Sequence, residues 1–146
     1  MTGEFTVALH ALVYLDHKAC TLSSEELAEN ICTNPARVRK VMARLKKAGL
    51  LTTKEGAVGG YRFDGDPARV TLLDVADAVE ARFVAASWHS GNEEMDCLVA
   101  SGMAGIVDEL CGELNELCRE KLSRLTVADI SEKIFGASGA VSGKGA

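Results

Sequence analysis

The sequence contains no run of about twenty apolar residues, the length that a helix needs to cross a bilayer. Its start, from Met1 to Phe5, lacks the basic residues and the small-residue cleavage site of a secretion signal. The five cysteines are irregularly spaced and do not form a disulfide framework, so we expect free thiols in a reducing compartment. These absences predict a cytoplasmic protein without a membrane partner.

Catalytic signatures are missing as well. There is no phosphate-binding loop, nucleophile elbow or metal-ligand spacing, and the three histidines, His10, His17 and His89, lie far apart in the sequence. We therefore expect that the protein is not an enzyme. Its 146 residues, of which 47% are hydrophobic, are enough for one domain with its own core and an added oligomerisation helix.

Positive charge is scarce in the chain as a whole but abundant in one segment. The formal net charge is −5, yet residues 33–62 carry eight Lys and Arg against one acid, Glu55, which makes a local charge of +7. Residues 71–135 carry thirteen acids against five bases, a local charge of −8. Because salt screens charges beyond about 10 Å, the local charge decides what a surface binds. We therefore expect residues 33–62 to bind a polyanion.

Apolar residues at helical spacing predict three helices in the first third of the chain, over residues 4–18, 24–31 and 35–47. Ser23 and Glu26 have the spacing of a capping box, in which a hydroxyl and a carboxylate each satisfy a free backbone amide at the helix start. The second helix should therefore begin directly after Ser23.

The third helix has clear signals at both ends. Thr33 or Asn34 can cap its start, and Pro35 suits its first turn. Gly49 is expected to end it in a left-handed conformation. Its predicted buried stripe consists of Val38, Val41, Met42 and Leu45.

Two short stretches that can be extended, residues 50–54 and 61–63, flank the pair Gly59-Gly60, which we interpret as the turn of a hairpin. Further helices are predicted over residues 72–81, 98–125 and 127–135, with an irregular polar stretch from 83 to 96 and a disordered tail over 136–146.

A capped helix, a tight turn, a basic helix and a glycine hairpin follow one another in the order of a winged helix-turn-helix, which binds DNA with its second helix in the major groove. Arg can read guanine and Asn adenine, whereas Lys suits phosphates. The predicted contacts to double-stranded DNA are Ser24, Asn34, Ala36, Arg37, Arg39, Lys40, Arg44 and Lys47 in the helices, and Lys54, Gly59, Gly60, Tyr61 and Arg62 in the hairpin. The alternative is a solvated basic face on a protein-interaction adaptor that has lost DNA binding.

The long helix carries two apolar rows side by side, which favours burial on two sides and therefore a dimer seam. One row is Val107, Cys111, Leu114, Cys118, Leu122 and Leu125, and the other is Met103, Ile106, Leu110 and Leu117. The alternative is a helix sunk into the core of its own chain.

The stretches Leu27-Ala28, Asn34-Pro35, residues 38–50 and Gly59-Gly60-Tyr61 resemble the bacterial Rrf2 family of winged-helix regulators, and the resemblance extends from residue 1 to about 135. It implies a homodimeric regulator, expected to act as a repressor, with one helix-turn-helix per subunit on a palindromic site. It also implies a long helix that crosses to the partner and a wing that enters the minor groove. Family members that bind an iron–sulfur cluster carry an Arg near the position of Glu55, so the wing of this chain departs from that pattern.

The fold class that we expect is mainly α, a winged helix-turn-helix with a small β-hairpin wing and a long C-terminal dimerisation helix. The corresponding division is a DNA-binding domain over residues 1–82, a loop and candidate sensor region over 83–97, dimerisation helices over 98–135, and the tail over 136–146.

The cysteines of this chain do not follow the cluster-binding pattern of the family, in which three close cysteines precede the long helix. That region offers Cys97 alone, whereas a cluster needs about four converging ligands. We therefore expect no cofactor, no iron–sulfur cluster and no metal. Cys97, at the start of the long helix, should have a lowered pKa, and it is either a redox sensor or an inert thiol. The other cysteines, Cys20, Cys32, Cys111 and Cys118, are expected to be small buried apolar residues.

Overall fold

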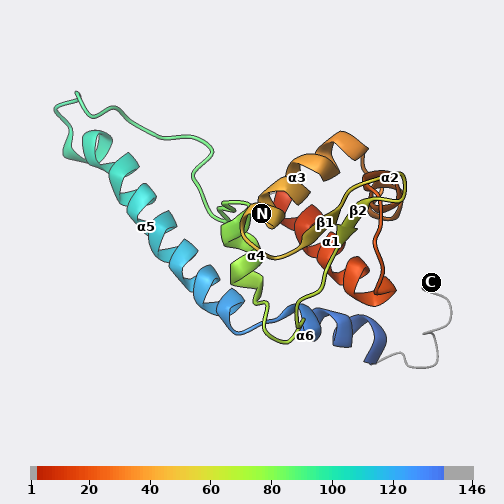
Figure 1. Ribbon diagram of the computed structural model, residues 1–146. Coiled ribbons are helices and arrows are strands. Elements are labelled where there is room, and N and C mark those ends of the chain that lie inside the picture. The colour runs from red at the N-terminus through yellow and green to blue at the C-terminus, as the bar shows by residue number, and fades with distance from the viewer. Residues whose placement is uncertain (1–2, 137–146) are drawn as a thin grey trace.

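The computed structural model describes residues 3–136, and the predicted tail beyond Gly136 lies outside the described residues. A helical body is formed by α1 (Gly3–Lys18), α2 (Ser24–Ile31), α3 (Pro35–Lys47) and α4 (Leu72–Ala78), with a hairpin of β1 (Thr52–Lys54) and β2 (Gly60–Arg62). From this body α5 (Leu98–Ser123) extends outward as a rod, and α6 (Val127–Ser131) with the π-helical turn η1 (Glu132–Gly136) returns to α1 (Figure 1). The fold is thus the expected winged helix-turn-helix with a long C-terminal helix.

The core of the body is built around α1, which buries residues on several sides, among them Ala8, Leu12 and Leu15. The predicted stripe of α3 is confirmed, because Val38, Val41, Met42 and Leu45 are each 0% exposed. Each such aliphatic side chain contributes about 1.5–3 kcal/mol when it leaves water. The outward side of α3 is therefore held at a fixed orientation by its buried side.

The predicted caps of the helix-turn-helix are confirmed. The Ser23 hydroxyl accepts from the Glu26 amide at 3.1 Å, and the Glu26 carboxylate accepts from the Ser23 amide at 3.3 Å. The Asn34 side-chain oxygen accepts from the amide of Arg37 at 2.8 Å, so Asn34 rather than Thr33 is the cap of α3. These bonds satisfy backbone donors that the first helical turn leaves free.

The hairpin corrects our interpretation of Gly59-Gly60. The two strands pair with Lys54 opposite Gly60, so the loop spans residues 55–59 and its left-handed residue is Gly56, with φ of 110°. A Cβ at Gly59 would overlap the carbonyl of Lys54, and one at Gly60 would overlap that of Leu22. Gly59 therefore closes the loop, with its amide donating to the Gly56 carbonyl at 3.0 Å, whereas Gly60 begins β2, and both glycines permit a close approach of backbones.

Two predicted helix ends also differ. The helix expected to run to residue 81 ends at Ala78, because Glu80 adopts a left-handed φ of 52° and the Ala81 amide bonds back to the Ala76 carbonyl at 2.8 Å. This is the geometry that usually needs glycine, so the sequence gives no warning of it. The helix expected over 127–135 is divided into α6 and η1.

Backbone hydrogen bonds fix the end of α5 to the body. The Leu72 amide donates to the Leu125 carbonyl at 2.8 Å, and the Val127 amide donates to the Val70 carbonyl at 2.9 Å. The irregular segment 83–97 runs back to the far end of α5 (Figure 1). The beginning of this segment is held against α5 by Asn115, whose side-chain oxygen accepts from the amides of Phe83 and Val84 at 3.0 and 2.9 Å. Near the far end, the Asn92 amide donates to the Ala100 carbonyl at 2.9 Å. Within residues 3–136, no helix is long and apolar enough to cross a membrane.

Candidate nucleic-acid interface

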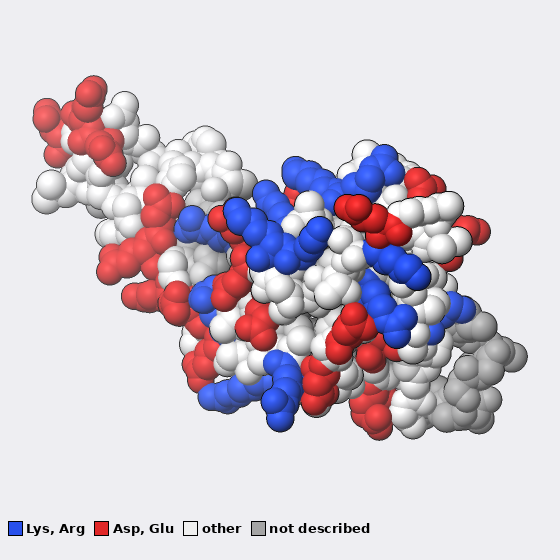
Figure 2. Space-filling model, viewed as in Figure 1, with Lys and Arg blue, Asp and Glu red and all other residues white. Residues whose placement is uncertain are grey.

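The outward side of α3 carries a row of exposed polar and cationic side chains. In and next to α3, the exposed residues among those predicted to contact DNA are Asn34, Ala36, Arg37, Arg39, Lys40 and Lys47, with Lys46 beside them. In Figure 2, Lys and Arg gather over the upper part of the body, whereas Asp and Glu dominate the outlying end of the molecule where α5 begins. The uneven charge of the sequence is thus also separated in space.

Acids from other parts of the fold accompany two of these cations. Arg39 lies 3.5 Å from the carboxylate of Glu25, and the amine of Lys40 lies 3.1 Å from that of Glu4. The Lys40 and Arg39 side chains remain 65% and 54% exposed, and ion pairs at such exposed sites are worth about 0–1 kcal/mol. A DNA phosphate can therefore replace either acid at little cost.

Arg44 occupies a different position from the other predicted contacts. Its guanidinium donates to the Glu4 carboxylate and to the Val79 carbonyl, both at 2.9 Å, so it joins α3 to α1 and to the end of α4. Ser24 is buried, and its hydroxyl accepts from Arg39 at 3.1 Å. The structure therefore places Arg44 and Ser24 where they hold parts of the body together, and not on the exposed surface where we expected DNA contacts.

The wing is joined to the start of α2. Tyr61 exchanges two backbone bonds with Leu22, at 2.8 and 2.9 Å, and its ring is half-buried. Burial raises the pKa of Tyr61 above its usual value, so its hydroxyl stays protonated at neutral pH. Lys54 is exposed, whereas the guanidinium of Arg62 donates to the carboxylate of Asp64 at 2.6 Å. One of the two wing cations is therefore paired with an acid of the same chain.

Four basic residues of this surface have no acid within ion-pair distance among residues 3–136. They are Arg37, Lys46, Lys47 and Lys54. They mark the ends of α3 and the first strand of the wing. The term basic face is used below for these four residues together with Arg39 and Lys40.

The two apolar rows of α5 have different surroundings. In the first row Cys111 is buried, Val107, Cys118, Leu122 and Leu125 are half-buried, and Leu114 is 39% exposed. Of these, Leu122 and Leu125 pack against the core of the body. In the second row Ile106, Leu110 and Leu117 are between 51% and 62% exposed, and Met103 is 37% exposed. The first row is thus largely used within the chain, and the second is left open to solvent.

The cysteines do not fit an iron–sulfur cluster. Cys97 starts α5, and Cys111 and Cys118 follow within the same helix, so their backbones are separated by about 21 and 10 Å along its axis. Cys20 and Cys32 are exposed, which corrects our expectation that they would be buried. Cys20 follows the end of α1, and Cys32 is the C-terminal cap of α2. Among the described residues, no three His, Cys, Asp or Glu side chains come together as a metal site.

Cys97 is exposed at the first position before α5. The nearby backbone amide of Ala100, and next that of Val99, lower the pKa of the thiol below its usual value. The direction agrees with our expectation, because a helix start stabilises negative charge.

These features define a DNA-binding regulator of the winged helix-turn-helix class. The chain matches the model of the Rrf2 family, described as iron-dependent transcriptional regulators, over residues 1–133, and it belongs to that family. It is 30% identical over 137 residues to YwnA of Bacillus subtilis, which is described as an HTH-type transcriptional regulator, and this covers 92% of the chain and 99% of YwnA. The resemblance inferred from the sequence is therefore correct, as is the expectation that the protein is a regulator and not an enzyme.

Solved structures show the same fold. A transcriptional regulator from Lactobacillus plantarum is 25% identical and superposes with a TM-score of 0.78, covering 92% of this chain and 91% of that one. CymR, the global cysteine regulator of B. subtilis, is 18% identical with a TM-score of 0.65, covering 91% and 96%. The T. potens protein IscR is 18% identical with a TM-score of 0.69, covering 94% and 90%.

Proposed function

We propose that this protein is a homodimeric repressor in which each subunit inserts α3 into the major groove of one half of a palindromic operator. The observation that carries the proposal is the two-sided character of α3. Its inner side is completely buried, while its outer side presents the basic face. A helix held so firmly can place Arg37, Arg39 and Lys40 against base edges in a fixed register. Lys46, Lys47 and Lys54 would contact phosphates and supply affinity without sequence preference.

Two residues of the predicted interface take a supporting role in this proposal. Ser24 would orient Arg39, and Arg44 would hold α3 against α1 and α4. Asn34 and Ala36 lie exposed at the leading end of α3, and Gly59, Gly60 and Tyr61 bring the wing against Leu22.

The second subunit would cover the open row of α5. Met103, Leu110 and Leu117 are seven residues apart, and so are Val99 and Ile106, which is the repeat of a helix pair. Gly102 lies between these positions, and a Cβ there would meet nothing within 4 Å in this chain. Glycine in a helix costs about 1 kcal/mol of helix stability relative to alanine. A partner helix that approaches closely at Gly102 would explain why glycine is present there.

We propose further that the protein acts without an iron–sulfur cluster, since its cysteines lie far apart along α5 and at two helix ends. The lowered pKa of Cys97 instead makes its thiolate a target for hydrogen peroxide, which would oxidise it to a sulfenic acid while the peroxide is reduced to water. A larger polar group at the start of α5 would then disturb the joint between the subunits.

Alkylation and oxidation test the role of Cys97. A lowered pKa means more thiolate at a given pH, so iodoacetamide should modify Cys97 faster at pH 7 in the native protein than in urea. Peroxide should weaken DNA binding of the wild type and of Cys20→Ser and Cys32→Ser, but not of Cys97→Ser. An equal response of Cys97→Ser would assign the sensitivity elsewhere, and stoichiometric iron in anaerobically purified protein would refute the absence of a cluster.

Selection of duplexes from a random pool tests the DNA-binding proposal. The selected sequences should contain two half-sites related by a two-fold axis, with centres one or more helical turns of about 34–36 Å apart. Recovery of single half-sites, or failure to enrich any sequence from the pool, would contradict the proposal and favour the adaptor alternative.

A further inference from the structure

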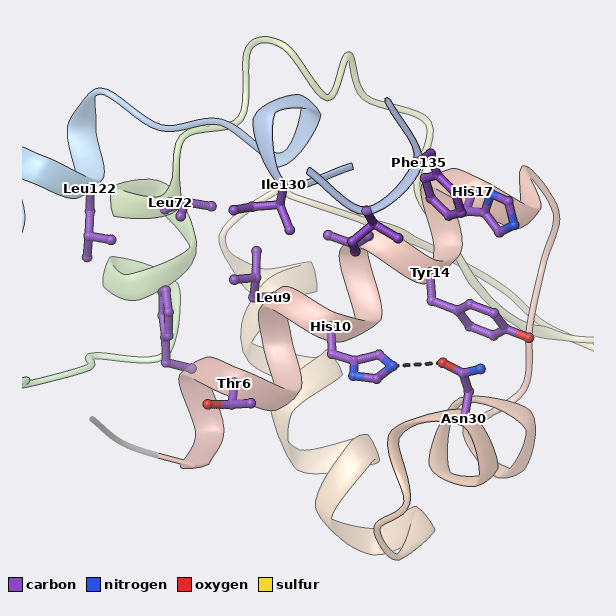
Figure 3. Close-up of a pocket in the computed structure, with 13 residues that line it drawn as sticks. Thr6, Leu9, His10, Tyr14, His17, Asn30, Leu72, Leu122, Ile130 and Phe135 are labelled. Carbon is purple, nitrogen blue, oxygen red and sulfur yellow. Dashed lines mark hydrogen bonds between the residues drawn. The ribbon is translucent and has the colours of Figure 1, made fainter. Parts of the chain in front are cut away.

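A pocket of about 570 Å³ lies against α1, and its lining includes the buried residues Phe5 and Val13. It is enclosed by α1, by Leu72 of α4, by Leu122 at the end of α5, and by α6 with η1 (Figure 3). Pockets of about 300–1,000 Å³ are of the size that holds small organic molecules. None of the exposed residues in the open row of α5 lines it.

The chemistry of the pocket restricts what it can hold. Its thirteen lining residues include no Lys, Arg, Asp or Glu, and most are aliphatic or aromatic. One wall is formed by the rings of His17 and Phe135, which stack with centroids 4.3 Å apart and an interplanar angle of 18°. A charged ligand would lose its hydration without gaining a counter-ion. The pocket therefore suits an uncharged molecule with a flat or branched apolar body.

One edge of the pocket offers a specific polar contact. The Nε2 of His10 donates to the side-chain oxygen of Asn30 at 2.7 Å, because a carbonyl oxygen can only accept (Figure 3). In the neutral ring this leaves Nδ1 as an acceptor. A hydroxyl on the ligand can donate to that nitrogen, which a plain hydrocarbon cannot do.

The pocket is placed where its occupation would reach the DNA-binding surface. Its polar edge includes Asn30, which belongs to α2, the first helix of the helix-turn-helix. Its floor is α1, whose first turn carries Glu4, bonded to Lys40 and Arg44 of α3. Its opposite wall is α6, which is tied through the 70–72 segment to the end of α5. A ligand here would contact the elements that set the angle between the helix-turn-helix and the long helix.

We infer that this pocket binds a small uncharged hydroxylated ligand, of the class of alkylphenols, and that its occupation changes DNA affinity. The binding part stands by itself, whereas the coupling part rests on the proposed function. Only a ligand that interacts differently with two conformations of the protein can shift its DNA affinity, and such couplings are about 5–150-fold.

Binding is tested on the full-length protein with 4-ethylphenol, with ethylbenzene as the probe that lacks the hydroxyl and 4-ethylbenzoate as the charged one. Leu9→Trp fills the pocket, and Ala68→Trp adds the same ring at an exposed site outside it. Calorimetry and NMR shifts should show one 4-ethylphenol per chain in the wild type and in Ala68→Trp, and none in Leu9→Trp. His10→Phe should remove the preference for 4-ethylphenol over ethylbenzene while circular dichroism stays unchanged.

Coupling is tested by DNA affinity on a selected duplex. Saturating 4-ethylphenol should change the Kd of the wild type about 5-fold or more, and Leu9→Trp should shift it in the same direction without ligand. A wild type that binds DNA but none of the three probes overturns the inference and leaves the proposed function standing. Binding that survives Leu9→Trp, or preference for 4-ethylbenzoate, overturns the assigned site. Probe binding without any DNA binding would instead refute the proposed function.

Discussion

The helices α3 and α5 differ in how many of their residues they bury. Four of the 13 residues of α3 are buried, and together they close one full side of the helix. Only Cys111 is buried among the 26 residues of α5, although that helix carries two apolar rows. The buried core takes its residues from positions 5–79 and from Val127, and none from α5. The buried core is therefore closed without a fully buried residue from α5, while α5 exposes an apolar row that the proposed second subunit would cover.

The comparison also separates two kinds of exposed side chain. On α3 most of the exposed residues are cations, which are stable in water and available to phosphates or base edges. On α5 the exposed row includes Ile106, Leu110 and Leu117, whose contact with water is unfavourable by about 25 cal/mol per Å². DNA binding by α3 can thus be transient, whereas the pairing through α5 should be permanent.

The largest effect is expected from a charge in the open row. Leu110→Glu removes apolar contact and places a carboxylate without a partner in the seam, which costs about 3–5 kcal/mol. Sedimentation velocity should show monomers, and operator affinity should fall more than about 100-fold. Glu109→Ala, on the adjacent polar side of the helix, should remain dimeric. A dimeric Leu110→Glu with normal DNA affinity would break the distinction between the two helices.

Substitutions on α3 should have effects of about 1–3 kcal/mol each on DNA binding. Arg39→Ala should weaken the selected operator and relax its sequence preference, whereas Lys47→Ala should weaken all duplexes alike and reduce their salt dependence. Arg44→Ala should mainly lower the free energy of unfolding, because it leaves the Val79 carbonyl and Glu4 without their donor. Lys133→Ala, on the distant η1, is the control for loss of charge alone. If Arg39→Ala and Lys47→Ala bind the selected operator as tightly as the control Lys133→Ala does, α3 is not the helix that contacts the DNA bases.

The caps of α2 and α3, the buried stripe of α3 and the order of the elements could all be predicted, because each depends on residues within a few positions of one another. The ion pairs could not. Glu4 reaches Arg44 across 40 positions, and Asp64 lies just beyond the segment whose charge we counted. The local charge of +7 therefore overstates the free positive charge of the surface, because tertiary folding brings Glu4 to α3 and because Asp64 lies outside the counted segment.

The pocket and two of the cysteines show the same limit. The apolar residues that line the pocket resemble ordinary core positions in the sequence, and only the tertiary arrangement of α1, α4, α5 and α6 leaves space between them. Cysteine is a residue type that is usually buried, yet Cys20 and Cys32 are both exposed. Cys32 caps the end of α2 with a left-handed φ of 62°. Side-chain type predicts burial within a regular helix better than at its ends.

A smaller effect should come from releasing a wing cation. Asp64 is held ionised because the hydrogen bond from Arg62, and next that from Thr52, lowers the pKa of its carboxyl group. Asp64→Asn would remove this competing charge, so DNA affinity should rise and the salt slope should steepen by about one ion. Asp66→Asn, whose partner is Arg69, should leave both unchanged. An unaltered salt slope in Asp64→Asn would place Arg62 outside the DNA contact.

The smallest effect distinguishes two glycines of α5. A Cβ at Gly102 or at Gly112 would meet nothing within this chain, so alanine should stabilise the helix at both by up to about 1 kcal/mol. At Gly102, on the side of Val99 and Ile106, the methyl group should instead crowd the partner helix and weaken association by about 1 kcal/mol. Gly112→Ala should show only the gain in thermal stability. Equal gains at both positions, with unchanged association, would mean that no helix approaches Gly102.

The central claim is that α5 pairs two chains so that two copies of α3 read one duplex. Native mass spectrometry of the wild-type protein, titrated onto a duplex selected from the random pool, tests this most directly. We expect complexes that contain two chains of 15.5 kDa per duplex at every protein ratio, with no populated complex that contains one chain. A predominant one-chain complex at substoichiometric protein, with the free protein monomeric at micromolar concentration, would contradict it.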